Sequence, residues 1–102
     1  LSMSVPAMAK VSYNDAVKYL ENVNRLVYYL IERAQELADI ALEQGNMRAV
    51  YAIRAALSWS TETIISNAMD WAERNGIPVE HEYITVIVGG MPLEIDPIHI
   101  LW

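Results

Sequence analysis

The sequence contains no cysteine, which excludes disulfide bonds, thiolate metal sites and cysteine nucleophiles. Basic residues are also few: the 102-residue chain has 7 Lys and Arg against 13 Asp and Glu, and its formal net charge is -6. Nucleic-acid and anionic membrane surfaces require clustered basic side chains, and here these are scattered along the chain. We therefore expect neither nucleic acid nor a membrane as a partner, and the lack of cysteine fits a cytoplasmic protein.

The sequence also lacks a long uncharged stretch. The longest, Tyr83–Leu93, has 11 residues, whereas a membrane-spanning helix needs about 20. Hydrophobic residues nevertheless make up 54% of the chain, more than a disordered protein carries. This length and composition predict one folded domain over residues 12–102, preceded by a flexible N-terminal segment over residues 1–11.

The strongest pattern is a heptad repeat of apolar residues that follows Ser12. An acidic residue stands three positions after Ser12, which is typical of a helix N-cap. Apolar residues then recur at alternating steps of 4 and 3. They are Ala16, Leu20, Val23, Val27, Leu30, Ala34, Leu37 and Ala41. Further apolar residues flank this line, so the pattern predicts a bundle helix over residues 13–44 rather than a two-stranded coiled coil.

The sequence "EQGN" is expected to end this helix. Gly45 suits the left-handed position after a helix, and Asn46 can cap a following helix. So short a link predicts an antiparallel second helix over residues 47–75. Beside the apolar line of that helix lie the small residues Ala49, Ala52, Ala56 and Ser60. The hydroxyl-rich stretch 58–63 could kink or break this helix, because hydroxyl groups compete for backbone hydrogen bonds.

Near the C-terminus the apolar pattern changes from a helical period to alternation. Between Tyr83 and Asp96, apolar residues alternate around Gly89-Gly90, which permits a two-residue turn or part of a four-residue loop. Either turn places one apolar set on a common face. That set contains Ile84, Val86, Leu93 and Ile95. We expect a short β-hairpin that covers helices of its own chain or of a partner.

The sequence thus predicts a mainly α fold, a long antiparallel helical hairpin with a short C-terminal β-hairpin. Two helices form one contact line rather than a closed core. Strands of about five residues cover some 17 Å, whereas the first helix extends about 48 Å. The uncovered remainder predicts a homodimer that completes a four-helix bundle. The predicted interface residues are Leu20, Val23, Val27, Leu30, Leu37, Ile84, Val86, Leu93, Ile95 and Trp102.

An acidic stripe on the first helix supports an alternative function. It consists of Glu32, Glu36, Asp39 and Glu43. The stripe is similar to those that hold Mg²⁺ in all-α nucleotide pyrophosphohydrolases, which implies a small metal-dependent hydrolase. A solvated acidic face explains it more simply, since Arg33 and Arg54 are near enough to pair with the acids. We therefore favour a non-enzymatic, homo-oligomeric structural or interaction module, with a subunit of a hetero-complex as a further alternative.

The two histidines lie close to carboxylates in the predicted hairpin. If the strands pair, His81 approaches the Asp96–His99 segment, and histidine with carboxylate can bind a metal. The separation of 18 residues between the histidines fits no ligand spacing. The serines in "SWSTETIIS" also have no histidine at helical spacing to activate them. We predict no catalytic residue, metal or cofactor.

Overall fold

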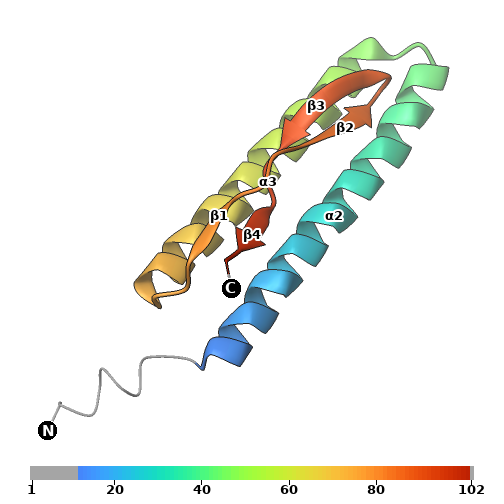
Figure 1. Ribbon diagram of the computed structural model, residues 1–102. Helices are drawn as coiled ribbons and strands as arrows, with labels where there is room; N and C mark the ends of the chain where they lie inside the picture. The colour runs from blue at the N-terminus through green and yellow to red at the C-terminus, as the bar shows by residue number, and fades with distance from the viewer. Residues whose placement is uncertain (1–11, 102) are drawn as a thin grey trace, which may run out of the picture.

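The computed structural model describes residues 12–101. The segment predicted to be flexible, 1–11, and the predicted interface residue Trp102 lie outside the described residues. The elements are α2 (Tyr13–Glu43), α3 (Met47–Arg74), β1 (Val79–His81), β2 (Ile84–Val88), β3 (Met91–Ile95) and β4 (Ile98–Ile100). The two helices lie side by side, and the strands run along them (Figure 1). The predicted mainly α fold, a helical hairpin with C-terminal antiparallel strands, is confirmed.

The helix ends follow the capping residues of the sequence. The hydroxyl of Ser12 accepts a hydrogen bond from the backbone N–H of Asp15 at 3.1 Å and begins α2. Gly45 ends α2 with a φ of 70°, which a residue with a side chain adopts at a cost. The side chain of Asn46 accepts a hydrogen bond from the N–H of Ala49 at 3.1 Å and begins α3. The predicted boundaries of both helices therefore hold to within one residue.

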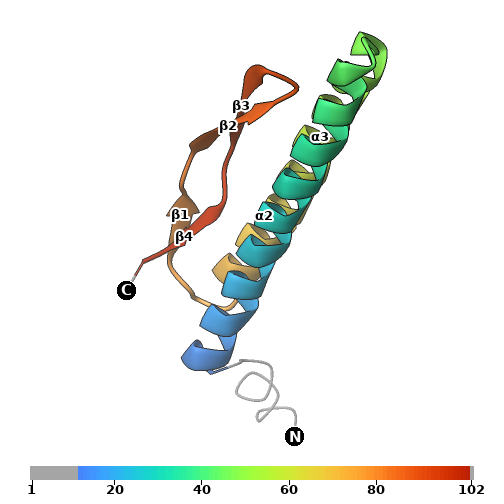
Figure 2. The same ribbon diagram turned by 90° about the vertical axis from the view of Figure 1, so that its right-hand side faces the viewer.

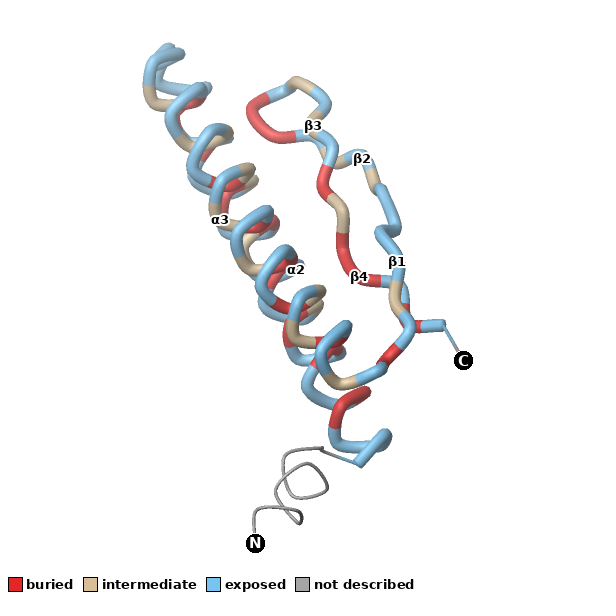
Figure 3. Tube along the Cα trace, turned by 90° about the vertical axis from the view of Figure 1, so that its left-hand side faces the viewer, coloured by how far each residue is buried: buried red, intermediate tan, exposed pale blue. Residues whose placement is uncertain are grey.

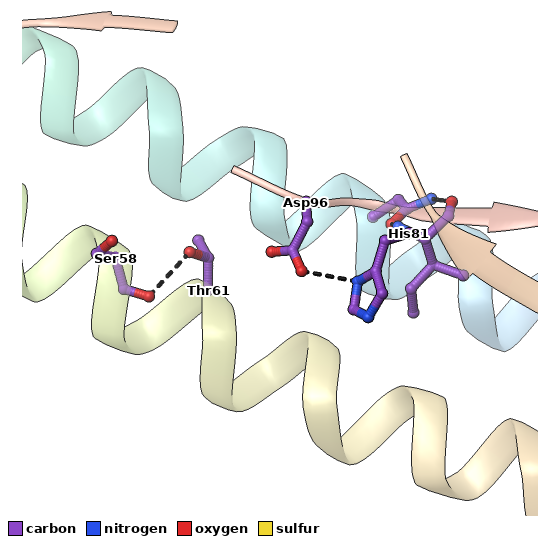
Figure 4. Close-up of polar contacts among 6 residues, drawn as sticks. Ser58, Thr61, His81 and Asp96 are labelled. Carbon is purple, nitrogen blue, oxygen red and sulfur yellow. Dashed lines mark hydrogen bonds and ion pairs between the residues drawn. The ribbon is translucent and has the colours of Figure 1, made fainter. Parts of the chain in front are cut away.

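The hydroxyl-rich part of α3 is helical without a break. The hydroxyl of Thr61 donates to the carbonyl of Leu57 at 2.8 Å. It also donates to the carbonyl of Ser58 at 3.2 Å (Figure 4). The hydroxyl of Thr63 likewise donates to the carbonyl of Trp59 at 2.8 Å. Such bonds to the preceding turn satisfy the hydroxyl groups inside the helix. The competition that could have broken the helix is thereby removed.

The four strands form a single antiparallel ribbon that is longer than the predicted hairpin. β2 pairs with β3, β1 pairs with β4, and one register runs through both pairs. Pro97 lies at the interruption between them and has no N–H to donate, although its carbonyl accepts from Glu82 at 2.8 Å. The described part of the C-terminal tail thus pairs with β1 as the strand β4.

A tight turn closes the ribbon near the end where α2 passes into α3 (Figure 1). Val88 pairs with Met91, so the turn has two residues, and φ is 65° at Gly89 and 78° at Gly90. Positive φ at both positions is the requirement of a type I′ turn. A Cβ atom on Gly89 would collide with Cγ1 of Val50 on α3. Glycine at this position therefore allows the ribbon to approach the helix closely.

The side chain of Arg54 on α3 attaches the turn of the ribbon to the helices. Its guanidinium donates to the carbonyls of Val88, Met91 and Pro92 at 2.8, 2.9 and 2.9 Å. The expected pairing of Arg54 with the acidic stripe is therefore wrong, because the guanidinium points toward the ribbon. On the other side, Gln35 of α2 donates to the carbonyl of Ile87 at 3.0 Å.

Asn24 of α2 makes a comparable contact with β4. Its side-chain amide donates to the carbonyl of Ile98 at 2.7 Å, and its side-chain oxygen accepts from the N–H of Ile98 at 2.9 Å. The amide thus occupies the position that a neighbouring strand would occupy. This contact satisfies backbone groups that an edge strand otherwise leaves open.

The molecule has two layers, a helix pair and a ribbon that lies against one face of it (Figure 2). Buried side chains of both helices and of the ribbon form one core between the layers (Figure 3). The radius of gyration is 17.2 Å, whereas a compact chain of this length has about 13 Å. The chain is therefore elongated and flat, and the ribbon covers one side of the helices only.

Candidate functional site

The face of the helix pair that points away from the ribbon carries no layer formed by residues 12–101 (Figure 2). We call it the uncovered face and define it by helical position around the groove described below. On α2 it consists of Tyr19, Leu26, Leu30, Arg33, Leu37 and Ile40, and on α3 of Ala49, Ile53, Ala56, Ser60, Ile64, Asn67 and Trp71. Leu26 and Leu37 are each 45% exposed, and Ile40 is 53% exposed. Large apolar side chains thus face solvent along this side.

A groove of about 220 Å³ lies between the two helices on this face. It is lined by Leu30, Arg33, Ala34, Leu37, Ile53, Ala56, Leu57 and Ser60. Apart from the guanidinium of Arg33 and the hydroxyl of Ser60, every lining side chain is apolar. The groove offers no set of polar groups for chemistry, and it suits an apolar side chain of a partner.

Charge is rare on the uncovered face. Arg33 is the single charged residue among the positions named above, and Asp15 and Arg74, which are exposed, lie at the same helical angles at the end of the helix pair that is far from the ribbon's turn. The guanidinium of Arg33 lies 3.1 Å from the carboxylate of Glu36, and both side chains are about half exposed. The positive charge is therefore balanced within the same helix, at the border of the face. A partner surface needs no acidic group to match it.

The structure divides the predicted interface residues into two groups. Leu20 and Val27 are fully buried and Val23 nearly so, inside the core of their own chain. The ribbon residues of the prediction also pack into that core; they are Ile84, Val86, Leu93 and Ile95. Leu30 and Leu37 lie on the uncovered face, the first half-buried and the second exposed. Of the described residues in the predicted set, these two are therefore available to a partner.

This division follows from the geometry of a straight helix. A strict heptad repeat drifts by about 20° in each heptad around an α-helix of 3.6 residues per turn. The early residues Ala16 and Val23 face the core of the chain, whereas Leu37, in the same heptad position, has rotated outward. The next residue, Ala38, lies in the core in place of Leu37, and Ile31 lies in the core in place of Leu30. The heptad repeat therefore contributes residues both to the core and to the uncovered face, and the pattern alone does not tell which residues belong to which.

The acidic stripe of α2 points into solvent. Its four residues, Glu32, Glu36, Asp39 and Glu43, are all exposed. Glu36 takes part in the ion pair with Arg33, which was expected from the sequence. Between residues 12 and 101, no group of three or more His, Asp or Glu side chains is arranged to hold a metal ion. The arrangement that a metal-dependent hydrolase needs, with carboxylates turned inward between facing helices, is not formed by these four residues.

The ribbon brings the two histidines to carboxylates, as the sequence suggested. Nδ1 of His81 lies 2.7 Å from Oδ2 of Asp96 (Figure 4), and Nδ1 of His99 lies 3.7 Å from Oε1 of Glu82. The rings of His81 and Tyr83 stack at a centroid distance of 5.6 Å. These contacts join the two sides of the ribbon where its ladder is interrupted.

The pair of His81 and Asp96 borders an open cavity of about 520 Å³ between α3 and the ribbon. The cavity is lined by Glu62, Ile65, Ser66, Met69, Asp70, His81, Tyr83, Glu94 and Asp96. Most of its ionisable groups are acidic, and no basic side chain other than the imidazole lines it. The pair can exchange a proton or form an ion pair, but no activated nucleophile accompanies it among the described hydrogen bonds.

Some residues of the site were missed by sequence reasoning. Ile53 belongs to the apolar line of the second helix, and its place on an exposed groove has no sequence signal. The small residues beside that line, Ala49, Ala52, Ala56 and Ser60, were a signal that another backbone could approach. The roles of Arg54 and Asn24 could not be predicted, because their acceptors lie more than thirty residues away.

Comparison with known proteins gives no relative: no protein-family model, no curated protein and no solved structure matches this chain. Neither α2 nor α3, the two helices of the described range, is long and apolar enough to cross a membrane.

Proposed function

We propose that this protein is a non-enzymatic interaction module that assembles with itself through the uncovered face of α2 and α3. The observation that supports this proposal is the mostly apolar face on the side opposite the ribbon, where Arg33 is the single charged residue that lines the groove. Continuous apolar surface of this extent in a small protein marks an interface. Burying it stabilises an assembly by roughly 25 cal/mol for each Å² removed from water.

The size of the face fits a stable dimer. The 28 residues of α3 extend about 42 Å. With helix axes 8–10 Å apart, the pair presents a surface roughly 20 Å wide. Each copy then contributes about 800 Å², and a pair of copies buries about 1,600 Å² in total, which is the usual size of a specific interface.

A second copy also completes the architecture. Two helix pairs that meet face to face form a four-helix bundle, with one ribbon on each outer side. The acidic stripe, the cavity at His81 and the ends of the chain's ribbon remain outside the interface. The net charge of -6 then repels copies everywhere except on the uncovered face, which favours one mode of contact.

The test uses two substitutions that are matched in exposure. Leu37 and Tyr28 lie on the same helix, and each is 45% exposed. They are nine residues apart, so they point in opposite directions. In Leu37→Asp, a two-fold dimer would bury two carboxylates, at several kcal/mol each. In Tyr28→Asp, the new carboxylate stays in solvent.

Sedimentation equilibrium gives the readout. We expect the unmodified chain and Tyr28→Asp to have twice the mass of one chain, and Leu37→Asp to have the mass of a single folded chain. Circular dichroism checks that Leu37→Asp stays helical. A chain that remains monomeric at all concentrations, or a Leu37→Asp variant that remains dimeric, would contradict the proposal. A soluble monomer would instead favour a different protein as the partner.

A further inference from the structure

Negative charge is spread over the molecule but is rare on the uncovered face. The chain carries 13 acidic residues against 7 basic ones, which gives the net charge of -6. The acidic stripe of α2 is exposed, and so are Glu62, Asp70 and Glu73 on α3, and none of these residues belongs to the face. The net charge of each copy therefore lies outside the proposed contact.

We infer that ionic strength controls the self-assembly of this protein: two copies separate at low salt and pair through the uncovered face as salt screens their negative charge. This inference rests on the self-assembly proposed above, and it adds how that assembly is regulated. The attraction comes from apolar burial, which acts at contact, whereas the repulsion between two copies of the same net charge acts at a distance. The two contributions therefore respond differently to salt.

The distances in the proposed bundle fall in the range where salt acts. Packed helix axes lie about 8–10 Å apart and a helix with its side chains is about 10–12 Å wide, so charges on the outer surfaces of two copies are roughly 20 Å apart. This separation is shorter than the Debye length of about 30 Å at 10 mM salt and longer than that of about 8 Å at 150 mM. The repulsion is therefore strong at the lower salt concentration and largely screened at the higher one.

The face has no set of charges that would reverse this response. Interfaces held by complementary charges weaken as salt rises. Here the guanidinium of Arg33 lies 3.1 Å from the carboxylate of Glu36 in its own helix. The exposed Asp15 and Arg74, at one end of the face, have opposite signs. These four residues bring no net charge to the contact, so we expect the dissociation constant of the dimer to fall as salt rises.

Exposed residues of α2 provide matched charge variants. Glu32→Lys with Asp39→Lys changes the net charge from -6 to -2, because each substitution adds two positive charges. Lys18→Glu with Arg25→Glu changes it from -6 to -10, because each substitution removes two. All four side chains are exposed and lie outside the uncovered face. Both variants therefore keep the proposed contact and alter the charge around it, and circular dichroism checks that both remain helical.

Sedimentation equilibrium of the full chain at pH 7 gives the dissociation constant in NaCl from about 10 to 500 mM. We expect the constant of the unmodified chain to fall at least about ten-fold over this range. The fall should be smaller in the variant of charge -2 and larger in the variant of charge -10. At the highest salt concentration, the three constants should agree to within about two-fold, because the charges are then screened.

The outcomes separate this inference from the proposed function. A dimer whose dissociation constant rises with salt, or does not change, would overturn control by ionic strength and leave self-assembly intact. An equal fall in all three chains would overturn it as well, since salt would then act through apolar burial and not through charge. A monomer at every salt and protein concentration would overturn the proposed function and this inference together.

Discussion

The contact of Gly89 with α3 provides a sharp test of how the ribbon is held. Gly89 and Gly90 form one turn and have similar φ angles of 65° and 78°. A Cβ atom on Gly89 would collide with Val50, whereas a Cβ atom on Gly90 would lie 3.7 Å from the nearest atom, Cδ2 of Leu42. The two glycines therefore share the backbone requirement and differ in the space around them.

The magnitudes follow from this difference. A side chain in the left-handed region costs roughly 1–2 kcal/mol, and this applies to Gly90→Ala and Gly89→Ala alike. Overpacking adds about 1–3 kcal/mol in Gly89→Ala alone, because Val50 is fully buried and has little room to move. We expect Gly90→Ala to lower the melting temperature by about 4–16 °C and Gly89→Ala by about twice as much.

A double-mutant cycle with Val50→Ala identifies the collision as the cause. Val50→Ala removes the atom that a Cβ atom on Gly89 would meet, so the two losses should not add. We expect the double variant to be more stable than the sum predicts, by roughly 1–2 kcal/mol. Urea unfolding followed by circular dichroism measures each free energy, at one protein concentration because the proposed self-assembly would make apparent stability depend on concentration. Equal losses in Gly89→Ala and Gly90→Ala, with additive free energies in the cycle, would refute close docking of the turn on α3.

Four further predictions concern the helices, the ribbon and metal binding. Arg54→Met should lower the free energy of unfolding by about 2–3 kcal/mol, because three carbonyl groups lose a charged donor; Arg48→Met, on an exposed part of α3, should change it by less than about 0.5 kcal/mol. Asn24→Leu should cost about 1–3 kcal/mol, since both backbone groups of Ile98 lose their partner; a neutral effect in urea unfolding would count against this contact. Thr61→Val should cost less than about 1 kcal/mol, because the helix keeps its own hydrogen bonds without the hydroxyl; a larger loss would show that the hydroxyl holds α3 together. Addition of a chelator should leave the melting temperature unchanged, since a tightly bound ion would raise it by mass action.

The local features of the fold could be predicted because they depend on neighbouring residues. Ser12, Gly45 and Asn46 act within one turn of the chain, through capping and a left-handed backbone. The alternation of the strands likewise places Ile84 and Leu93 on a common face whatever the turn. These signals predicted the ends of both helices to within one residue, and they predicted which hairpin residues share a face.

The length of the ribbon was less predictable. The segment after Pro97 has too few residues to show alternation, and its pairing with β1 depends on a register set by the distant turn. The continuity of α3 through Ser58 was also open, because the side chains that break a helix and those that bond within it are the same. The distant turn decided the pairing of the ribbon, and hydrogen bonds from Thr61 and Thr63 to the preceding turn of α3 accompany its continuity.

The sequence by itself determined the two helices, their caps, the hairpin of β2 and β3, and the existence of more apolar surface than two helices can bury in one contact line. The tertiary structure decided how that surface is divided. The heptad repeat places Val23 and Leu37 on the same line, but the helix turns at 3.6 residues, so Val23 lies in the core and Leu37 in solvent. Likewise Arg54, one of several scattered bases, becomes the anchor of the ribbon because three carbonyl groups meet at its position in space. Periodicity along the chain specifies a face, and packing in three dimensions specifies what that face meets.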